Sequence, residues 1–90
     1  MNPLCQHLAA LDTRHLRHDT QYICPECVAL GSNWVHLRIC QACGHVGCCD
    51  NSPNRHATKH FQASQHPVIT SAEPGEQWAW CYVDEDVREY

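Results

Sequence analysis

Residues 24–66 decide the fold of this chain, and they read CPECVALGSNWVHLRICQACGHVGCCDNSPNRHATKHFQASQH. Two Cys-x2-Cys pairs are followed by a lone cysteine and by three spaced histidines. Because a structural zinc ion takes four such ligands in a tetrahedral arrangement, the stretch holds enough ligands for two ions. The candidate ligands are Cys24, Cys27, Cys40, Cys43, Cys48, His56, His60 and His66.

The composition favours metal ions over disulfide bonds as the source of stability. The 90 residues predict a single domain, residues 1–90, with a core from about residue 5 to residue 84. A chain of this length buries only a small hydrophobic core. The opening residues MNPLCQHL lack the segments of a secretory signal, and no apolar run could span a membrane. We therefore expect a cytoplasmic protein with reduced thiols, in which interleaved cysteines and histidines bind zinc.

The charge balance argues against a nucleic-acid partner. The formal net charge is −4, and the chain has only six lysines and arginines. Binding to phosphates requires a basic surface, which this balance does not provide. We expect no nucleic acid and no membrane among the partners. A nucleic-acid-binding zinc protein stays as an alternative, because Cys-x2-Cys motifs also occur in that class.

Periodicity and turn residues predict a small α+β domain, with a short twisted antiparallel sheet and one main helix. Ser52 followed by Pro53 is a typical helix start, so the helix is expected over about residues 53–63 with Ser52 as its N-cap. Trp78 and Trp80 lie on one face of a predicted strand, and we expect them to pack rather than to bind a ligand. The predicted strands are residues 34–39, 68–71 and 77–83.

The remaining segments have weaker patterns. A short helix or a loop is expected at residues 8–11, and a connector at residues 28–33. The acidic end after residue 84 is expected to form one helical turn or to fray. His36 is interpreted as a surface residue of a strand, and Cys49 as a small buried side chain outside the metal sites.

The order of the ligands limits how two ions can share them. His56 and His60 lie four residues apart on one face of the predicted helix, so they could bind one ion or two. Residues 56–60 read HATKH and lack the glutamate of the HExxH metalloprotease motif. A cross-braced arrangement is therefore favoured. It assigns Cys24, Cys27, Cys48 and His56 to site 1, and Cys40, Cys43, His60 and His66 to site 2.

The order of motifs from Cys5 to Asp84 resembles the UBP-type zinc finger, here in a free-standing form. This domain occurs in ubiquitin-specific proteases and in a ubiquitin-binding histone deacetylase. The resemblance implies the same cross-braced sharing, and a third zinc that joins an N-terminal Cys-x-His to a C-terminal Cys-x2-Cys. The last cysteine of that pattern is Asp84 here, which can bind zinc through one oxygen or merely cap a turn. Three zinc ions are expected, with site 3 formed by Cys5, His7, Cys81 and Asp84.

Family members that bind ubiquitin hold its free C-terminal Gly-Gly with an aromatic wall, an arginine and tyrosine hydroxyls. The resemblance therefore implies a site for a peptide or protein C-terminus. Trp34 matches the aromatic wall and Tyr82 matches one tyrosine, although both could instead be core residues. The family's Arg-Tyr pair falls on Asp50-Asn51, where an acidic side chain would repel a carboxylate. Arg55 could supply a cation from another direction.

These patterns predict a monomeric, non-catalytic zinc-binding module for protein interaction. Its expected partner is a peptide or protein C-terminus, such as the Gly-Gly tail of ubiquitin. A purely structural zinc domain is the alternative. An enzyme is disfavoured because a catalytic zinc keeps an open position, whereas sites 1 and 2 are each filled by four protein ligands. Cys49 is the only unassigned thiol, and no partner for thiol catalysis is identifiable.

Overall fold

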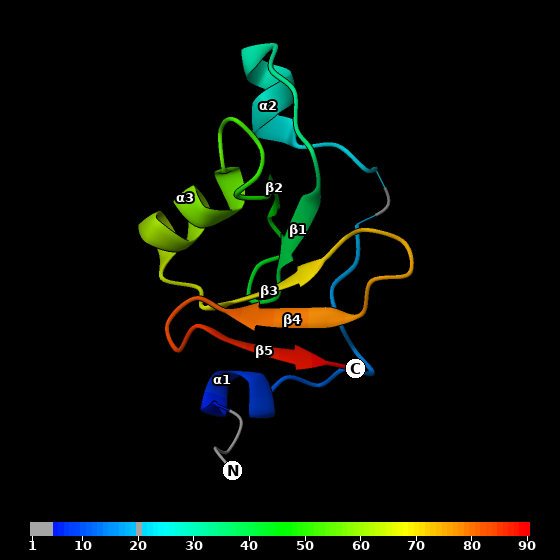
Figure 1. Cartoon of the computed structure of the whole chain (residues 1–90), viewed down its shortest axis with the longest axis vertical. Coiled ribbons are helices and arrows are strands. Elements are labelled where there is room, and N and C mark those ends of the chain that lie inside the picture. The colour runs from blue at the N-terminus through cyan, green and yellow to red at the C-terminus, as the bar shows by residue number, and fades with distance from the viewer. Residues whose placement is uncertain (1–4, 20) are drawn as a thin grey trace.

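A five-stranded antiparallel sheet forms the centre of the molecule in the computed structural model, which describes residues 5–19 and 21–90 (Figure 1). The strand order is β2-β1-β3-β4-β5, and every neighbouring pair is antiparallel. This confirms the predicted small α+β class. In chain order the elements are α1 (Gln6–Ala9), α2 (Pro25–Leu30), β1 (Leu37–Cys40), β2 (Val46–Cys48), α3 (His56–Ser64), β3 (Val68–Ser71), β4 (Trp78–Cys81) and β5 (Asp86–Glu89).

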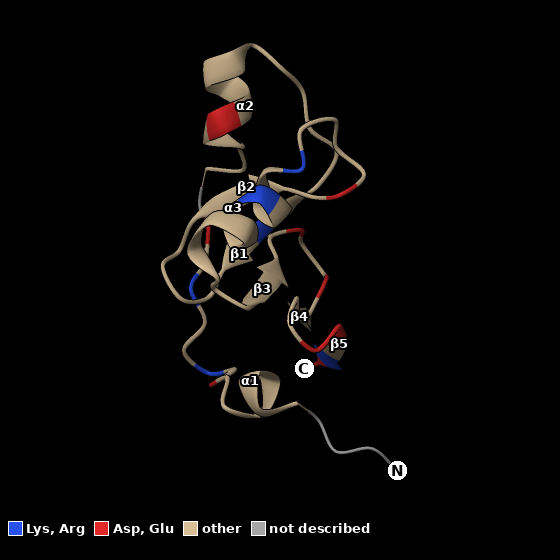
Figure 2. Ribbon diagram, turned by 90° about the vertical axis from the view of Figure 1, so that its left-hand side faces the viewer, with Lys and Arg blue, Asp and Glu red and all other residues tan. Residues whose placement is uncertain are grey.

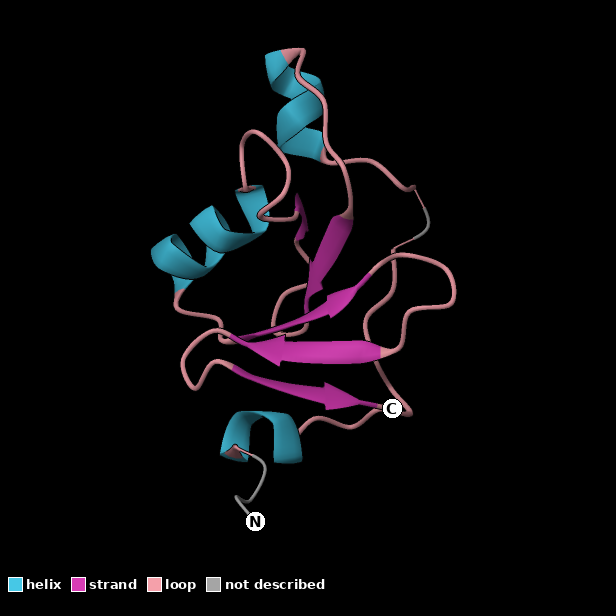
Figure 3. Ribbon diagram, viewed as in Figure 1, coloured by secondary structure: helices cyan, strands magenta, loops and turns pink. Residues whose placement is uncertain are grey.

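The helices cover different ends of the sheet (Figure 3). Helix α3 packs on β1 and β2, and α2 packs on β2, whereas α1 packs on β4 and β5. The buried core is divided accordingly into two clusters, one around Leu8 and Cys81 and one around Leu37 and Cys48. Within residues 5–19 and 21–90, five of the seven largest fully buried side chains are cysteines. Candidate metal ligands therefore occupy the positions that large apolar side chains fill in an ordinary core.

The main helix begins later than predicted. Helix α3 begins at His56, not at Pro53, and Ser52 is not its N-cap. The buried Ser52 hydroxyl instead accepts a hydrogen bond from the Val35 backbone N–H, at 2.8 Å. The first backbone N–H of the helix, on His56, donates to the Cys48 sulfur at 3.2 Å. The need to bring His56 to Cys48 therefore sets the helix start, and Arg55 adopts a left-handed conformation to make the turn.

Two further segments differ from the sequence prediction. The first half of the predicted connector at residues 28–33 is helical, because α2 begins at Pro25 and ends before Gly31. Proline at the first helical position and glycine in a left-handed C-cap are ordinary signals for a short helix. The acidic end forms a strand, β5, not a helical turn, and it supplies hydrogen bonds to the outer edge of β4.

Other expectations agree with the structure in part or fully. Strand β3 lies where it was predicted, at residues 68–71. The predicted strand at residues 34–39 is shifted, because β1 begins at Leu37. A short helix does form near the N-terminus, with the Cys5 sulfur accepting the Leu8 N–H at 3.4 Å. Cys49 is buried, as expected.

Charged residues are distributed over several elements. The lysines and arginines lie in the loop before α2, on β1, at the start of α3 and on β5 (Figure 2). Acidic residues are concentrated in β5 and in the turns before and after β4. No helix in the described part of the chain has the length and apolar character to cross a membrane.

Gly47 allows β2 to lie directly against α3. A Cβ atom at this position would lie 2.6 Å from the backbone nitrogen of Ala57, and the backbone cannot move without displacing His56. We expect Gly47→Ala to destabilise the domain by about 3 kcal/mol, near the upper end for overpacking. Thermal unfolding of the zinc-loaded protein measures this. Gly75→Ala is the matched control, because its Cβ meets open space and only left-handed strain of about 1 kcal/mol is expected. Equal unfolding temperatures for the two variants would contradict the close contact.

Candidate metal centres and an aromatic pocket

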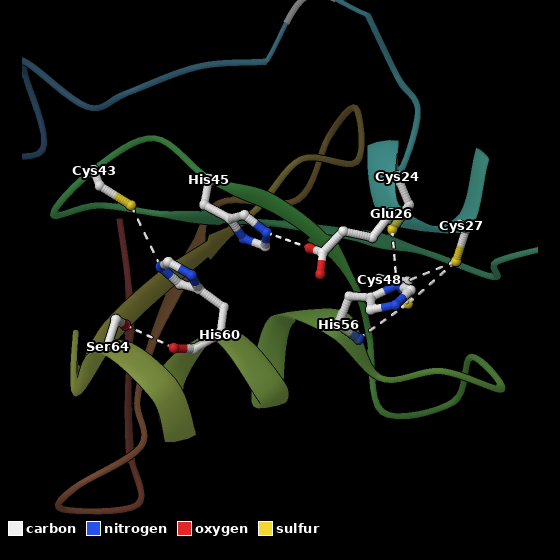
Figure 4. Close-up of polar contacts among 9 residues, drawn as sticks. All are labelled: Cys24, Glu26, Cys27, Cys43, His45, Cys48, His56, His60 and Ser64. Carbon is white, nitrogen blue, oxygen red and sulfur yellow. Dashed lines mark hydrogen bonds and ion pairs between the residues drawn. The ribbon is translucent and has the colours of Figure 1, made fainter. Parts of the chain in front are cut away.

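The residues predicted for site 1 meet between α2, β2 and the start of α3 (Figure 4). All four are buried. The Nδ1 atom of His56 lies 3.3 Å from the Cys24 sulfur, 3.4 Å from the Cys27 sulfur and 3.5 Å from the Cys48 sulfur. The sulfurs of Cys27 and Cys48 are 3.8 Å apart. Around a tetrahedral zinc, sulfur and nitrogen ligands lie about 3.5 Å apart and two sulfurs about 3.8 Å apart, so this donor set fits zinc.

The residues predicted for site 2 meet one helical turn farther along α3, on the same face of that helix as site 1 (Figure 4). The Cys43 sulfur lies 3.3 Å from Nε2 of His60, and the Cys40 sulfur lies 3.5 Å from Nδ1 of His66. Cys40 is buried and Cys43 is exposed, whereas both histidines are half-buried. Two sulfurs and two imidazoles again make a donor set that suits zinc, but in a more accessible place than site 1.

The residues predicted for site 3 bring the two ends of the described chain together. Helix α1 carries His7, with Cys5 as its N-cap, and the turn after β4 carries Asp84. The Cys81 sulfur lies 3.5 Å from Nδ1 of His7 and 3.6 Å from a carboxylate oxygen of Asp84. The hydrogen bond with His7 holds the pKa of Asp84 below its usual range, so the carboxylate is in the ionised form that binds metal.

Burial makes several of these thiols hard to ionise without a cation. It raises the pKa of Cys24 to about 11, and it raises the pKa of Cys5 and of Cys40 as well. The thiolate is the form that binds zinc, so zinc must displace protons from these sulfurs. Metal loading of the domain therefore releases protons and weakens as the pH falls.

Sites 1 and 2 are linked by a pair of residues that the sequence prediction missed. Glu26 of α2 lies between Cys24 and Cys27, and its carboxylate makes a hydrogen bond with Nε2 of His45 (Figure 4). The His45 ring stacks on the His60 ring, with centroids 4.1 Å apart. Contacts of this kind orient metal ligands. No spacing rule predicts the pair, because Glu26 and His45 are 19 residues apart.

An aromatic pocket of about 260 Å³ lies on one face of the sheet, beside the segment that follows β2. By strand register, Arg38, Ile69 and Trp80 share this face. Of the predicted peptide-binding residues, Tyr82 lines the pocket but Trp34 and Arg55 do not. Trp34 packs against the site 1 cluster, and Arg55 is exposed before α3. The pocket is lined by Arg38, Cys49, Asp50, Asn51, Ile69, Trp78, Trp80 and Tyr82.

Arg38 is the one cation that lines this pocket, and the sequence prediction did not single it out. Its guanidinium lies 4.6 Å from the centre of the Trp78 ring, and Nη1 donates to the Leu37 carbonyl at 3.0 Å and the Ser71 hydroxyl at 3.3 Å. The side chain is 14% exposed. A fixed guanidinium among aromatic rings can make charge-assisted hydrogen bonds with an anion. The sequence does contain a signal for its position, because Arg38 alternates with the apolar residues Leu37 and Ile39 in a predicted strand and therefore faces the opposite side of the sheet.

Interleaved cysteine and histidine groups that replace a hydrophobic core define a zinc-binding domain of the zinc-finger class. Residues 24–89 match the family described as "Zn-finger in ubiquitin-hydrolases and other protein". The chain therefore belongs to this family of UBP-type zinc fingers, and it is a zinc-binding module.

Similar proteins include large enzymes and one small protein. Ubiquitin carboxyl-terminal hydrolase 44 of Ailuropoda melanoleuca is 32% identical over 91% of this chain, which spans only 11% of the hydrolase. NAD-dependent deacetylase sir2A of Dictyostelium discoideum is 37% identical over 66% of the chain, which spans 10% of that protein. The solution NMR structure of protein RPA1320 from Rhodopseudomonas palustris is 50% identical, with a TM-score of 0.76, and the match covers 99% of this chain and 84% of that one.

Proposed function

We propose that this domain binds the free C-terminus of a peptide or protein, such as the Gly-Gly tail of ubiquitin, in the aromatic pocket. The position of Arg38 carries the proposal, because it places a fixed guanidinium in a pocket walled by Trp80 and Tyr82. In this proposal the three ligand groups hold one zinc each and form a scaffold without catalytic function. The domain acts as a monomer in the cytoplasm, where its thiols stay reduced.

The chemistry of the pocket fits a chain terminus. Flat aromatic walls contact the narrow backbone of small residues such as glycine, and the guanidinium pairs with the terminal carboxylate. Arg38 thus takes the part that the family assigns to an arginine at the position of Asp50. Trp34 and Arg55 lie outside the pocket, so in this proposal they contact the partner beyond its last residues.

The relatives support a partner in the ubiquitin pathway, because several of them are named as ubiquitin carboxyl-terminal hydrolases. Their catalytic activity is not part of the proposal, since this chain spans about a tenth of their length. A larger hollow of about 720 Å³ has His60 of site 2 in its lining, but among the described residues no aromatic side chain other than His45 and His60 lines it. The smaller pocket therefore has the better chemistry for a peptide tail.

Titration calorimetry tests this proposal with the peptide Arg-Leu-Arg-Gly-Gly, prepared as the free acid and as the C-terminal amide. We expect the acid to bind the zinc-loaded protein at least about tenfold more tightly than the amide, because a hydrogen bond to a charged group contributes about 1.5–3 kcal/mol. Arg38→Met should abolish this difference. Arg14→Met is the matched control, because Arg14 lies in an exposed loop outside the pocket. Equal binding of acid and amide, or binding of neither, would overturn the proposal and leave a purely structural zinc domain.

A further inference from the structure

The aromatic pocket has too much negative charge around it for a ligand that carries only a terminal carboxylate. Arg38 already lies 3.8 Å from a carboxylate oxygen of Glu76, which is held by a hydrogen bond from the Ser71 hydroxyl at 2.6 Å. Asp50 adds a second carboxylate on the pocket lining. One guanidinium therefore faces two carboxylates. A terminal carboxylate that binds Arg38 would leave this region with two excess negative charges unless the ligand also carries a cation.

Thr58 of α3 connects Asp50 and Tyr82 through hydrogen bonds and fixes the orientation of the Asp50 carboxylate. The Thr58 hydroxyl donates to Oδ1 of Asp50, and its oxygen lies 3.3 Å from the Tyr82 hydroxyl. Thr58 has a single hydroxyl proton and a carboxylate can only accept, so the Tyr82 hydroxyl donates to Thr58. The Tyr82 ring is held by stacking on Phe61, with centroids 4.7 Å apart. The Tyr82 oxygen is thus left with acceptor capacity.

The Asp50 carboxylate also has one oxygen that is free to accept a hydrogen bond from a ligand. Its Oδ2 atom makes no hydrogen bond with any residue in the described ranges 5–19 and 21–90, and the residue is exposed. The lining of the pocket therefore combines the donor groups of Arg38 with acceptors from Asp50 and Tyr82. The Trp80 ring in the same lining offers an aromatic face that also attracts cations.

We propose that the domain selects C-termini that carry a basic side chain within their last few residues, with Asp50 binding that cation while Arg38 binds the terminal carboxylate. This inference rests on the proposed function and names the chemistry of its partner. Asp50, which replaces a family arginine, is then a specificity-determining residue. The acidic net charge of the chain favours the same kind of partner at longer range.

Three free-acid peptides that end in Lys-Gly-Gly, Gln-Gly-Gly and Glu-Gly-Gly test this proposal by titration calorimetry. For the zinc-loaded protein, we expect the lysine peptide to bind about fivefold more tightly than the glutamine peptide, the factor that corresponds to about 1 kcal/mol for a solvent-accessible charge pair. The glutamate peptide should bind more weakly still. Added salt should reduce these differences, because it screens exposed charges.

Asp50→Asn isolates the residue responsible. The lysine preference should fall to less than about twofold in this variant, and the lysine and glutamate peptides together with the two proteins form a double-mutant cycle. Asp12→Asn is the matched control, since it removes the same charge from an exposed loop outside the pocket. Zinc content and thermal unfolding verify that both variants are folded.

The outcomes separate this inference from the proposed function. If the acid still binds better than the amide but the lysine preference is absent or survives in Asp50→Asn, the inference is wrong and the proposed function stands. If the lysine peptide binds equally well as acid and amide, and only when Asp50 is present, the pocket recognises the cation alone and the carboxylate step is wrong. A lysine preference that requires both Asp50 and the free carboxylate supports the two together.

Discussion

Cys48→Ala is expected to prevent the domain from folding, whereas Cys49→Ala should leave it nearly unchanged. Cys48 is fully buried, and its sulfur lies 3.8 Å from the Cys27 sulfur and 3.5 Å from Nδ1 of His56. It also accepts the first backbone N–H of α3. Its loss removes a zinc ligand and the interaction that fixes the start of the helix. A structural zinc contributes about 10–16 kcal/mol, which is comparable to the whole stability of a small domain, about 5–15 kcal/mol.

Cys49 is an unusually close control, because it is adjacent and also buried. Its sulfur lies 3.6 Å from the Ser52 hydroxyl and belongs to none of the three ligand groups. Replacement by alanine removes one sulfur from a packed position, for which we expect a loss of about 1 kcal/mol. Native mass spectrometry for the zinc count and circular dichroism for folding compare the two variants. A Cys48→Ala protein with the zinc content and unfolding temperature of the wild type would show that site 1 is not a metal site.

The residues of sites 1 and 2 were predictable from the sequence because their signal is local, whereas site 3 was expected only from the resemblance to the UBP-type zinc finger. Cys24 and Cys27 are near neighbours in the chain, as are Cys40 and Cys43, and His56 and His60 share a helix face. The assignment of these pairs to particular ions depends on residues far apart in the chain. There, the absence of the HExxH motif favoured the cross-braced arrangement. The structure brings together the same three groups of four residues. Their occupancy by zinc, one ion each, stays a prediction.

The helix and strand boundaries were less predictable, because tertiary contacts override the local pattern. Ser52 and Pro53 form a strong helix start in isolation. In the structure the Ser52 hydroxyl instead accepts a hydrogen bond from the Val35 N–H, and the helix begins only at His56. Strand β5 has few apolar residues. It forms because the backbone groups on the outer edge of β4 are available for antiparallel pairing. Its Arg88 also donates to the carbonyls of Leu8 and Leu11, a contact across nearly the whole chain.

The aromatic pocket could be predicted only in part. Tyr82 and the Asp50-Asn51 replacement follow from the motifs, but Arg38 enters the pocket through the register of β1 with β3. Trp78 and Trp80 were expected to pack rather than to bind a ligand, but both are half-buried and line the aromatic pocket. Their i, i+2 spacing gives the common face, but not whether that face is covered. Pairing across the sheet, which no local pattern encodes, decides which side chains meet.

Asp84→Ala is expected to remove one zinc ion and release the N-terminal helix, while sites 1 and 2 stay loaded. Site 3 is the most exposed group, since the side chains of His7 and Asp84 are 43% and 42% exposed. It also has the only carboxylate ligand, whereas Cys81 is buried. The zinc in site 3 should therefore be the first to leave when a chelator is added. Site 1, in which all four residues are buried, should hold its zinc longest.

Native mass spectrometry should count three zinc ions in the wild type and two in Asp84→Ala. Hydrogen exchange should accelerate in α1, because without the zinc it is held against the sheet by the packing of Leu8, the bonds from Arg88 and the bond from the Cys5 N–H to Asp86. Glu85→Ala removes the same charge from the same turn and should keep all three ions. Two ions in the wild type, or three in Asp84→Ala, would mean that Asp84 only caps the turn after β4. In either case the loss of Asp84 removes no zinc, and the exchange rate of α1 should be nearly the same in all three proteins.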